Sequence, residues 1–257
     1  MKRNEKHYHF GNIYHYGRFN IMIKLYKKPN ITEADLCNFA RISTGKQKRT
    51  DEELIRHLID LEHESIFEHA SMTFFVKVPI YTARQWMRHR MGSFTEKSGR
   101  YSEMDDFEFG GFSVSKKKEC DVETYSEDTE KVINDDFGWY KYLLEGGFKK
   151  EEARQMLPLC TLTEFYWTVN LRSLMNFLSL RMDVHAQKDI RENAEEVYKV
   201  LEEYYPTIAN EWKLQDYAIK KMMKAWRKNK TNFNGLLGDV VFDEIFRLYF
   251  ESLKGDE

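Results

Sequence analysis

Arginine, histidine and small hydroxyl side chains gather in one stretch of the chain, RHRMGSFTEKSGRYSE, from Arg88 to Glu103. Arg binds a phosphate or a carboxylate through a planar pair of N–H donors, and Ser or Thr hydroxyls can complete such a site. The stretch therefore suggests a site for an anionic ligand. Charge clusters are more often solvated surface residues, so a polar helix end followed by a loop is the alternative interpretation.

A second set of ordered polar residues lies in NLRSLMNFLSLRMDVHAQ, from Asn170 to Gln187. At helical spacing, Arg172, Asn176 and Ser179 fall on a side of the helix different from its apolar side. Arg181 then follows between two apolar residues. The polar residues of this run are thus candidates for binding or chemistry in addition to those of the first stretch.

The composition favours one large soluble domain. The chain has 257 residues, of which 42% are hydrophobic and 15% aromatic, enough for a substantial core. Its formal charge is only −2, so it is not a general binder of polyanions. Three cysteines without a C-x-x-C pair argue against a disulfide framework and a thiolate zinc site. With no signal peptide or membrane-spanning run, we expect a cytoplasmic protein.

The elements that must position these residues can be predicted from periodicity and capping signals. The sequence predicts a helix-rich chain with at least two strands. It contains neither G-x-G-x-x-G nor G-x-x-x-x-G-K, the two glycine-rich motifs that bind nucleotide phosphates. The predicted strands are 71–78 and 160–169. The predicted helices are 31–40, 50–63, 80–92, 126–144, 149–157, one within 170–187, and 188–204.

Two of these helices carry detailed predictions. Thr50 and Glu53 have the spacing of a capping box, and the helix that follows is predicted to bury a stripe of Leu54, Leu58 and Leu61. The helix after Pro79 is predicted to continue to Gly92. This would place the first cationic stretch at the carboxyl end of a helix, with its cations directed away from the core.

Several segments together resemble the flavin-dependent thymidylate synthase family. RHR, seven further residues and then Ser98, preceded by ARQW and followed by GRYS, is similar to the signature of that family. The resemblance extends, in the family's order, to HESIFEH, EARQMLP and WTVNLRSLMNFLSLR. It covers roughly Leu36 to Pro206.

This resemblance implies an α+β fold, a helix-rich single domain with a small, mostly antiparallel sheet. It implies an amino-terminal arm at 1–21, a catalytic domain at 22–209 and a carboxyl-terminal helical extension at 210–257. The implied enzyme is an FAD-dependent methyltransferase that converts dUMP to dTMP. Methylenetetrahydrofolate is its carbon donor, and FADH2 regenerated from NADPH is its reductant. A homotetramer is implied, with Arg100 and Arg154 from one chain and Arg181 from its partner meeting in each site.

The resemblance also implies residue roles. The catalytic residue is Arg181, which acts on the uracil ring at N3. A cation in an apolar setting stabilises charge on the pyrimidine more than one in water would. The implied dUMP contacts are Gln85, Arg88, Glu96, Lys97, Ser98, Gly99, Arg100, Arg154 and Arg181. The implied FAD contacts are Ser65, Arg88, His89, Arg90, Glu96, Asn170, Leu171, Arg172 and Asn176.

Three other interpretations compete with these assignments. Ser98 could be a nucleophile activated by His89, but the sequence shows no third group to orient the pair. The segment from His63 to His69 has the wrong His spacing for H-E-x-x-H, so we expect no metal site. The basic segment KKMMKAWRKNK, from Lys220 to Lys230, is typical of a nucleic-acid or nucleotide-binding module without catalysis. A solvated helix face explains it better, and we do not expect nucleic acid as a partner.

Overall fold

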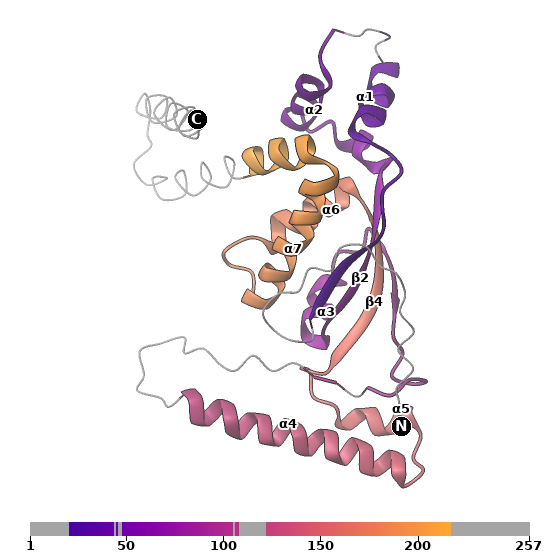
Figure 1. The fold of residues 1–257 in the computed structure, drawn as a ribbon, viewed down its shortest axis with the longest axis vertical. Helices are drawn as coiled ribbons and strands as arrows, with labels where there is room; N and C mark the ends of the chain where they lie inside the picture. The colour runs from indigo at the N-terminus through magenta and orange to yellow at the C-terminus, as the bar shows by residue number, and fades with distance from the viewer. Residues whose placement is uncertain (1–20, 44, 46–47, 105, 108–121, 217–257) are drawn as a thin grey trace, which may run out of the picture. The chain divides into compact units, whose positions relative to one another are not determined.

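The computed structural model describes residues 21–43, 45, 48–104, 106–107 and 122–216 of the chain (Figure 1). They form parts of two compact units. The first unit comprises the residues up to Thr32 together with Phe67–Val200, and the second comprises Glu33–Ile66 together with the residues from Leu201 onward. The domain boundaries expected from the sequence stay predictions, and all but the last residue of the arm expected at 1–21 lies outside the described residues.

The first unit is built on a four-stranded antiparallel sheet in the order β1-β2-β4-β3. Its strands are β1 Met22–Lys27, β2 Ser71–Pro79, β3 Ser93–Glu96 and β4 Leu162–Asn170. The central pair β2 and β4 is in register along its whole length, with Phe74 opposite Trp167. Alternate residues of both strands are buried, as the period of two requires. The predicted small antiparallel sheet is confirmed.

Helices α3 Ile80–Trp86 and α6 Leu171–Arg181 both contact the sheet. Figure 1 shows α3 beside β2 and β4. The rings of Trp86, Trp167 and Phe177 join the three elements, with centroid separations of 5.4 Å between the two tryptophans and 4.8 and 4.9 Å from these to Phe177. All three side chains are fully buried. This aromatic core fixes the ends of α3 and α6, which carry several of the candidate site residues.

Asn170 caps α6, as predicted. Its Oδ1 accepts a hydrogen bond of 2.8 Å from the backbone N–H of Ser173. The predicted apolar stripe of α6 is buried, and Arg172 and Asn176 are exposed. Helix α7 Lys188–Tyr204 has the predicted bounds, and its residues up to Val200 belong to the first unit.

The remaining helical elements of this unit lie beside the first cationic stretch, Arg88 to Glu103. They are α4 Val122–Glu145, α5 Lys150–Ala153 and the 3₁₀ turn η2 Arg154–Met156. The helix predicted at 149–157 is therefore one α turn followed by one 3₁₀ turn. No helix in the described part of the chain is long and apolar enough to cross a membrane.

The second unit contains α1 Glu33–Ile42 and α2 Asp51–Asp60. The capping box at Thr50 is confirmed, since its hydroxyl accepts from the N–H of Glu53 and the Glu53 carboxylate accepts from the N–H of Thr50. The predicted leucine stripe is wrong. Ile55 and Ile59 are the buried residues of α2, and Leu61 is 52% exposed. The buried side is rotated by one residue from the predicted stripe. Ile55 and Ile59 have the same i, i+4 spacing as Leu54 and Leu58, so the apolar pattern alone did not determine which pair is buried.

Residues 206–216 are helical and pack on α2 within the second unit. Arg56 donates two hydrogen bonds, of 3.0 and 2.9 Å, to the Glu211 carboxylate. Pro206 was predicted to end the preceding helix, and it does so while also opening this next one. Its fixed φ and missing N–H are tolerated at a first helical position.

Candidate active site

The segment that carries the first cationic stretch is not helical. Helix α3 ends at Trp86, six residues before the predicted end at Gly92, and β3 begins at Ser93. Arg88 and Arg90, both exposed, lie in the turn between them. Gly92 allows the close approach to β4, because a Cβ atom there would lie 2.7 Å from Nε1 of Trp167. The chain can reverse at this point only with a residue that lacks a side chain.

Arg181, the last residue of α6, makes two hydrogen bonds across to α3 and the turn that follows it. Its Nε donates to Nε2 of His89 at 3.0 Å, and its Nη2 donates to the backbone carbonyl of Gln85 at 2.9 Å. Both acceptors are uncharged groups. Within the described residues Arg181 forms no ion pair, so no neighbouring carboxylate offsets its charge.

Burial sets the ionisation of this pair. It lowers the pKa of Arg181, whose guanidinium nonetheless stays protonated in proteins. Burial, and to a smaller degree the charge of Arg181, lower the pKa of His89 from 6.5 to about 4. His89 is therefore neutral at pH 7 and accepts from Arg181 at Nε2. The site holds a half-buried cation beside a neutral imidazole.

The side chain of Gln85 belongs to a chain of polar contacts toward the start of α7. Its Nε2 donates to Oε1 of Gln187, and Nε2 of Gln187 donates to a carboxylate oxygen of Asp189 at 3.1 Å. The Tyr81 hydroxyl donates to the same oxygen at 3.2 Å. A carboxylate can only accept, so it determines which way both amides point. Oε1 of Gln85 has no hydrogen-bond partner in the part of the chain that the structure describes, and it could accept from a ligand.

A second cluster forms around the loop after β3. The Ser98 carbonyl accepts from the N–H groups of Tyr101 and Ser102, and its hydroxyl accepts from the N–H of Arg100 at 3.3 Å. Arg100 Nε donates to Glu151 at 3.1 Å. Gly99 lies against Arg154, since a Cβ at this glycine would be 3.3 Å from Cδ of that arginine. Two arginines and a serine thus converge here.

A hollow of about 330 Å³ lies at the end of the β3–β4 pair. It combines one cation with hydroxyl and amide groups that can donate to an anion. Its lining residues are Ser71, Arg90, Met91, Gly92, Ser93, Thr168, Val169 and Asn170. Because Oδ1 of Asn170 accepts the capping hydrogen bond of α6, the Nδ2 group is the part of this amide that can donate to a ligand.

The sequence that carries these clusters matches a known protein family. Residues 24–207 match the family model described as thymidylate synthase complementing protein. The chain is 44% identical over 183 residues to the flavin-dependent thymidylate synthase of Thermosipho melanesiensis, covering 65% of this chain and 80% of that protein. It is 40% identical over 180 residues to the Thermus thermophilus protein of the same name, covering 65% and 66%. The chain belongs to the flavin-dependent thymidylate synthase family.

A solved structure supports the same assignment. The fold matches the crystal structure of a UMP/dUMP methylase, PolB from Streptomyces cacaoi, bound with 5-Br dUMP, with a TM-score of 0.69 and 29% sequence identity. The match covers 76% of this chain and 96% of PolB. The α+β fold expected from the resemblance is confirmed. The match to the family model ends at residue 207, so the carboxyl-terminal segment lies outside it.

Within this flavin-dependent thymidylate synthase fold, the structure brings together subsets of the predicted site residues. One subset is Gln85, His89 and Arg181, a second is Ser98, Gly99, Arg100 and Arg154, and a third is Arg90 and Asn170. In the described part of the chain, neither Arg100 nor Arg154 forms a hydrogen bond or ion pair with Arg181. The predicted dUMP site is thus divided between two clusters.

Other predicted contacts have structural partners. Glu96 accepts from the Thr163 hydroxyl at 2.7 Å, and the N–H of Lys97 donates to the Glu164 carbonyl. Leu171 is buried, so any ligand contact there is through its backbone. Arg172 pairs with Glu68, and Asn176 and Arg88 are exposed. Ser65 belongs to the second unit, in the 3₁₀ turn Glu64–Glu68. The ligand roles of all these residues stay predictions.

Sequence reasoning missed Tyr81, Glu151, Gln187 and Asp189, which contact predicted site residues. Gln187 and Asp189 could have been noticed because they closely follow Arg181 in the chain. Tyr81 and Glu151 carry no comparable signal. Their importance depends on tertiary neighbours that a linear pattern does not contain.

The structure bears on two competing interpretations. Ser98 and His89 are not hydrogen-bonded to one another, since Nε2 of His89 accepts from Arg181 and Oγ of Ser98 accepts from Arg100. The arrangement lacks the contact that an activated serine needs. Among the described residues, no three His, Cys, Asp or Glu side chains are grouped as a metal site would require. The basic segment from Lys220 to Lys230 lies outside the described residues.

The two described cysteines are poor nucleophiles. Burial raises the pKa of the Cys37 thiol to about 11, and it also raises the pKa of Cys160. At neutral pH both remain protonated, whereas a reactive cysteine is a thiolate. Cys120 lies outside the described residues.

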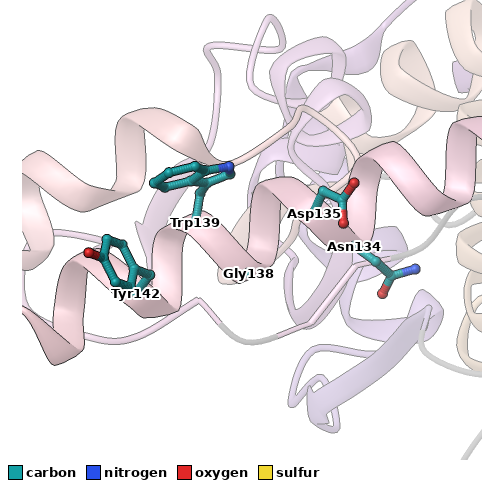
Figure 2. Close-up of a pocket in the computed structure, with 5 residues that line it drawn as sticks. All are labelled: Asn134, Asp135, Gly138, Trp139 and Tyr142. Atoms are coloured by element: carbon teal, nitrogen blue, oxygen red, sulfur yellow. The ribbon is translucent and has the colours of Figure 1, made fainter.

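A further hollow lies along α4, and none of the residues that line it is a predicted site residue (Figure 2). Its volume is about 390 Å³, and Asn134, Asp135, Gly138, Trp139 and Tyr142 line it. The rings of Trp139 and Tyr142 meet edge to face at 5.6 Å and are both largely exposed. It lacks a cation, so it does not resemble the anion site predicted from the sequence.

Proposed function

We propose that this chain is a flavin-dependent thymidylate synthase, a methyltransferase that converts dUMP to dTMP. In the balanced reaction, dUMP, methylenetetrahydrofolate, NADPH and a proton give dTMP, tetrahydrofolate and NADP⁺. FAD is the proposed cofactor and NADPH its reductant. We propose the cytoplasm as its location, consistent with the free thiols of Cys37 and Cys160.

The observation that carries the proposal is the environment of Arg181. A half-buried guanidinium that has two neutral acceptors, and no paired carboxylate among the residues that the structure describes, keeps its positive charge available to a ligand. When C5 of the uracil ring acts as a nucleophile, negative charge must be stabilised on the ring around N3. A preorganised cation shielded from water does this more effectively than a solvated one. Arg181 is accordingly the proposed catalytic residue.

The residues present fit an anionic cofactor such as FAD. The hollow beside β3 and β4 offers the Arg90 cation, the amide of Asn170 and the hydroxyls of Ser71 and Ser93. These donors suit a diphosphate, and a flavin bound there would supply the hydride for the methyl group. His89 directly precedes the lining residue Arg90, and Arg172 lies two residues after Asn170, in the first turn of α6. We propose the complete FAD set predicted from the sequence as its ligands.

The cluster around Ser98 is the proposed phosphate site for dUMP. Arg100 and Arg154 supply charge and N–H donors, and the Ser98 segment supplies a hydroxyl. These groups are tied to the α5 segment, whereas Arg181 is tied to α3. This separation supports the proposal that each site combines Arg100 and Arg154 of one chain with Arg181 of another, in a homotetramer.

The test is reconstitution of the purified full-length chain. We expect a flavin absorption spectrum after incubation with FAD, and dTMP formation only when dUMP, methylenetetrahydrofolate and NADPH are all present. Release of tritium from dUMP labelled at C5 measures the chemical step directly. A protein that binds no flavin and oxidises no NADPH in the presence of dUMP would refute the proposal.

A further inference from the structure

We propose that His89 is a positioning residue that orients the Arg181 guanidinium toward the uracil ring by accepting its Nε–H. This inference rests on the proposed function, in which Arg181 is catalytic. It assigns to His89 a role exerted through Arg181, in addition to the flavin contact predicted from the sequence.

Two acceptors on different guanidinium nitrogens determine the plane and the direction of the group. Nε is held by His89 and Nη2 by the Gln85 carbonyl. A single hydrogen bond would leave the guanidinium free to rotate about that bond, whereas two do not. Nη1 has no hydrogen-bond partner among the described residues, so this arrangement leaves it for substrate.

The imidazole can serve as a reference point because the core holds it. Its ring meets the Phe177 ring edge to face at a centroid distance of 4.9 Å, and its backbone N–H donates to the Trp86 carbonyl at 3.1 Å. Phe177 is fully buried and packs on Trp86. The position of His89, and through it that of Arg181, thus depends on the aromatic core between α3, α6 and the sheet.

A neutral acceptor suits this role better than a carboxylate. A guanidinium only donates, so Nε2 of His89 carries no proton and the remaining ring proton is on Nδ1. The lowered pKa of His89 agrees with a neutral ring, and the hydrogen bond from Arg181 selects the tautomer. An aspartate at the same position would fix the guanidinium equally well but would offset the charge that the uracil ring requires.

Two amide substitutions form a matched pair for the test. His89→Gln places an amide oxygen about as far from the backbone as Nε2, within reach of Arg181. His89→Asn introduces the same chemical group one bond shorter, out of reach. We expect His89→Gln to keep kcat within about threefold of the wild type. His89→Asn should lower kcat by about thirtyfold, the effect of one charged hydrogen bond. Flavin content and the KM for dUMP should be similar in both.

The Arg181→Ala background separates positioning from flavin binding. There the two substitutions should have the same effect, since the residue they position is gone. Equal losses of kcat for His89→Gln and His89→Asn in the protein that retains Arg181 would overturn the proposal. A difference between the two substitutions that persists in the Arg181→Ala protein would also overturn it. So would a loss of flavin that accounts for the slow turnover.

A direct measurement keeps the inference testable if the proposed function itself fails. In ¹⁵N NMR spectra of the flavin-loaded protein, the Arg181 Nε–H signal should be protected from solvent exchange in the wild type and in His89→Gln, but not in His89→Asn. Protection without any dTMP formation would refute the proposed function and leave the hydrogen bond established. Absence of protection in the wild type would refute the positioning role even in an active enzyme.

Discussion

Two arginines of this chain, Arg181 and Arg100, lie in opposite environments. Arg181 is half-buried and hydrogen-bonded to a neutral imidazole and a carbonyl. The Arg100 side chain is 52% exposed, contacts the Tyr101 ring, and is paired with the Glu151 carboxylate. The first charge is fixed and has no counterion in the described part of the chain, whereas the second is solvated and already has one.

We expect this difference to separate a residue that takes part in the chemistry from one that takes part in binding. A cation that is fixed and without a counterion can stabilise charge that appears only in the transition state, since it need not reorganise. An exposed arginine paired with a carboxylate can exchange that partner for a ligand phosphate. The free-energy cost of breaking the original pair is small, because it is that of a surface ion pair. We therefore expect substitutions of Arg181 to affect mainly turnover, and substitutions around Arg100 to affect mainly dUMP binding.

The largest effect should come from Arg181→Ala. We expect kcat to fall by about 10²–10³-fold, as for loss of other preorganised charge-stabilising groups. Flavin should remain bound, because this cation is assigned to the uracil ring. Steady-state assays with parallel absorption spectra measure both quantities.

Ser98→Ala is the control for this substitution, and its effect on turnover should be milder. A covalent adduct trapped on Ser98, together with complete loss of activity in the alanine variant, would show instead that the hydroxyl is the nucleophile. Loss of flavin from Arg181→Ala would contradict the separation of roles.

The next prediction tests whether the two arginines meet across subunits. Arg100→Ala and Arg181→Ala should each be nearly inactive. Random co-assembly of the two chains should leave about a quarter of the sites with both arginines intact, by symmetry. Activity should therefore return when the variants are co-expressed with different affinity tags and purified as mixed oligomers. If verified mixed oligomers stay as inactive as the parents, the sites lie within single chains.

How far the sequence could predict these environments depends on the kind of element. Helix α6 was predicted with its cap and its buried stripe, because its apolar residues recur at one period and only one side can face the sheet. The strands β2 and β4 were predicted for the same reason. These elements position Arg181, and the apolar residues around it were visible in the sequence.

The segment from Arg88 to Glu96 was predicted less well. A helix was expected to continue to Gly92 and then give way to a loop, but α3 ends at Trp86 and β3 forms at Ser93–Glu96. SFTE carries too little alternation to show a strand. Pairing with β4 decides its structure, and the small residue at Gly92 permits it. The hydrogen bond between His89 and Arg181 joins residues 92 positions apart, so no local pattern could have shown it.

The pH dependence of stability is a third test, and it concerns the neutral partner of Arg181. Because the pKa of His89 is lowered from 6.5 to about 4, the unfolded chain binds a proton between these values that the native protein does not. Stability should therefore rise from pH 4 to pH 6.5 and be independent of this group above it. The full shift corresponds to about 3 kcal/mol, and partial solvent exposure reduces this to about 2 kcal/mol.

Urea unfolding of the wild type and of His89→Gln across this pH range measures the contribution. The variant has no group that titrates at this position, so the difference in unfolding free energy between the two proteins should change with pH in this window. A constant difference from pH 4 to 7 would show that His89 is not held in its neutral form by burial.

The smallest expected effect comes from Glu151→Gln, which removes the counterion of Arg100. The carboxylate lies 3.1 Å from Nε of Arg100, and we expect it to compete with a substrate phosphate for the guanidinium. Without it, dUMP should bind about two- to fivefold more tightly at low salt, the effect of an exposed ion pair, and the gain should fade as salt screens the charges. Calorimetric titration with dUMP measures this difference. Glu103→Gln is the matched control, since it removes the same charge from the loop that carries Arg100, but from a carboxylate paired with Lys150. Weaker binding in Glu151→Gln alone would mean that the carboxylate orients Arg100 for the phosphate, and the contrast between a fixed and an exchangeable arginine would then not hold.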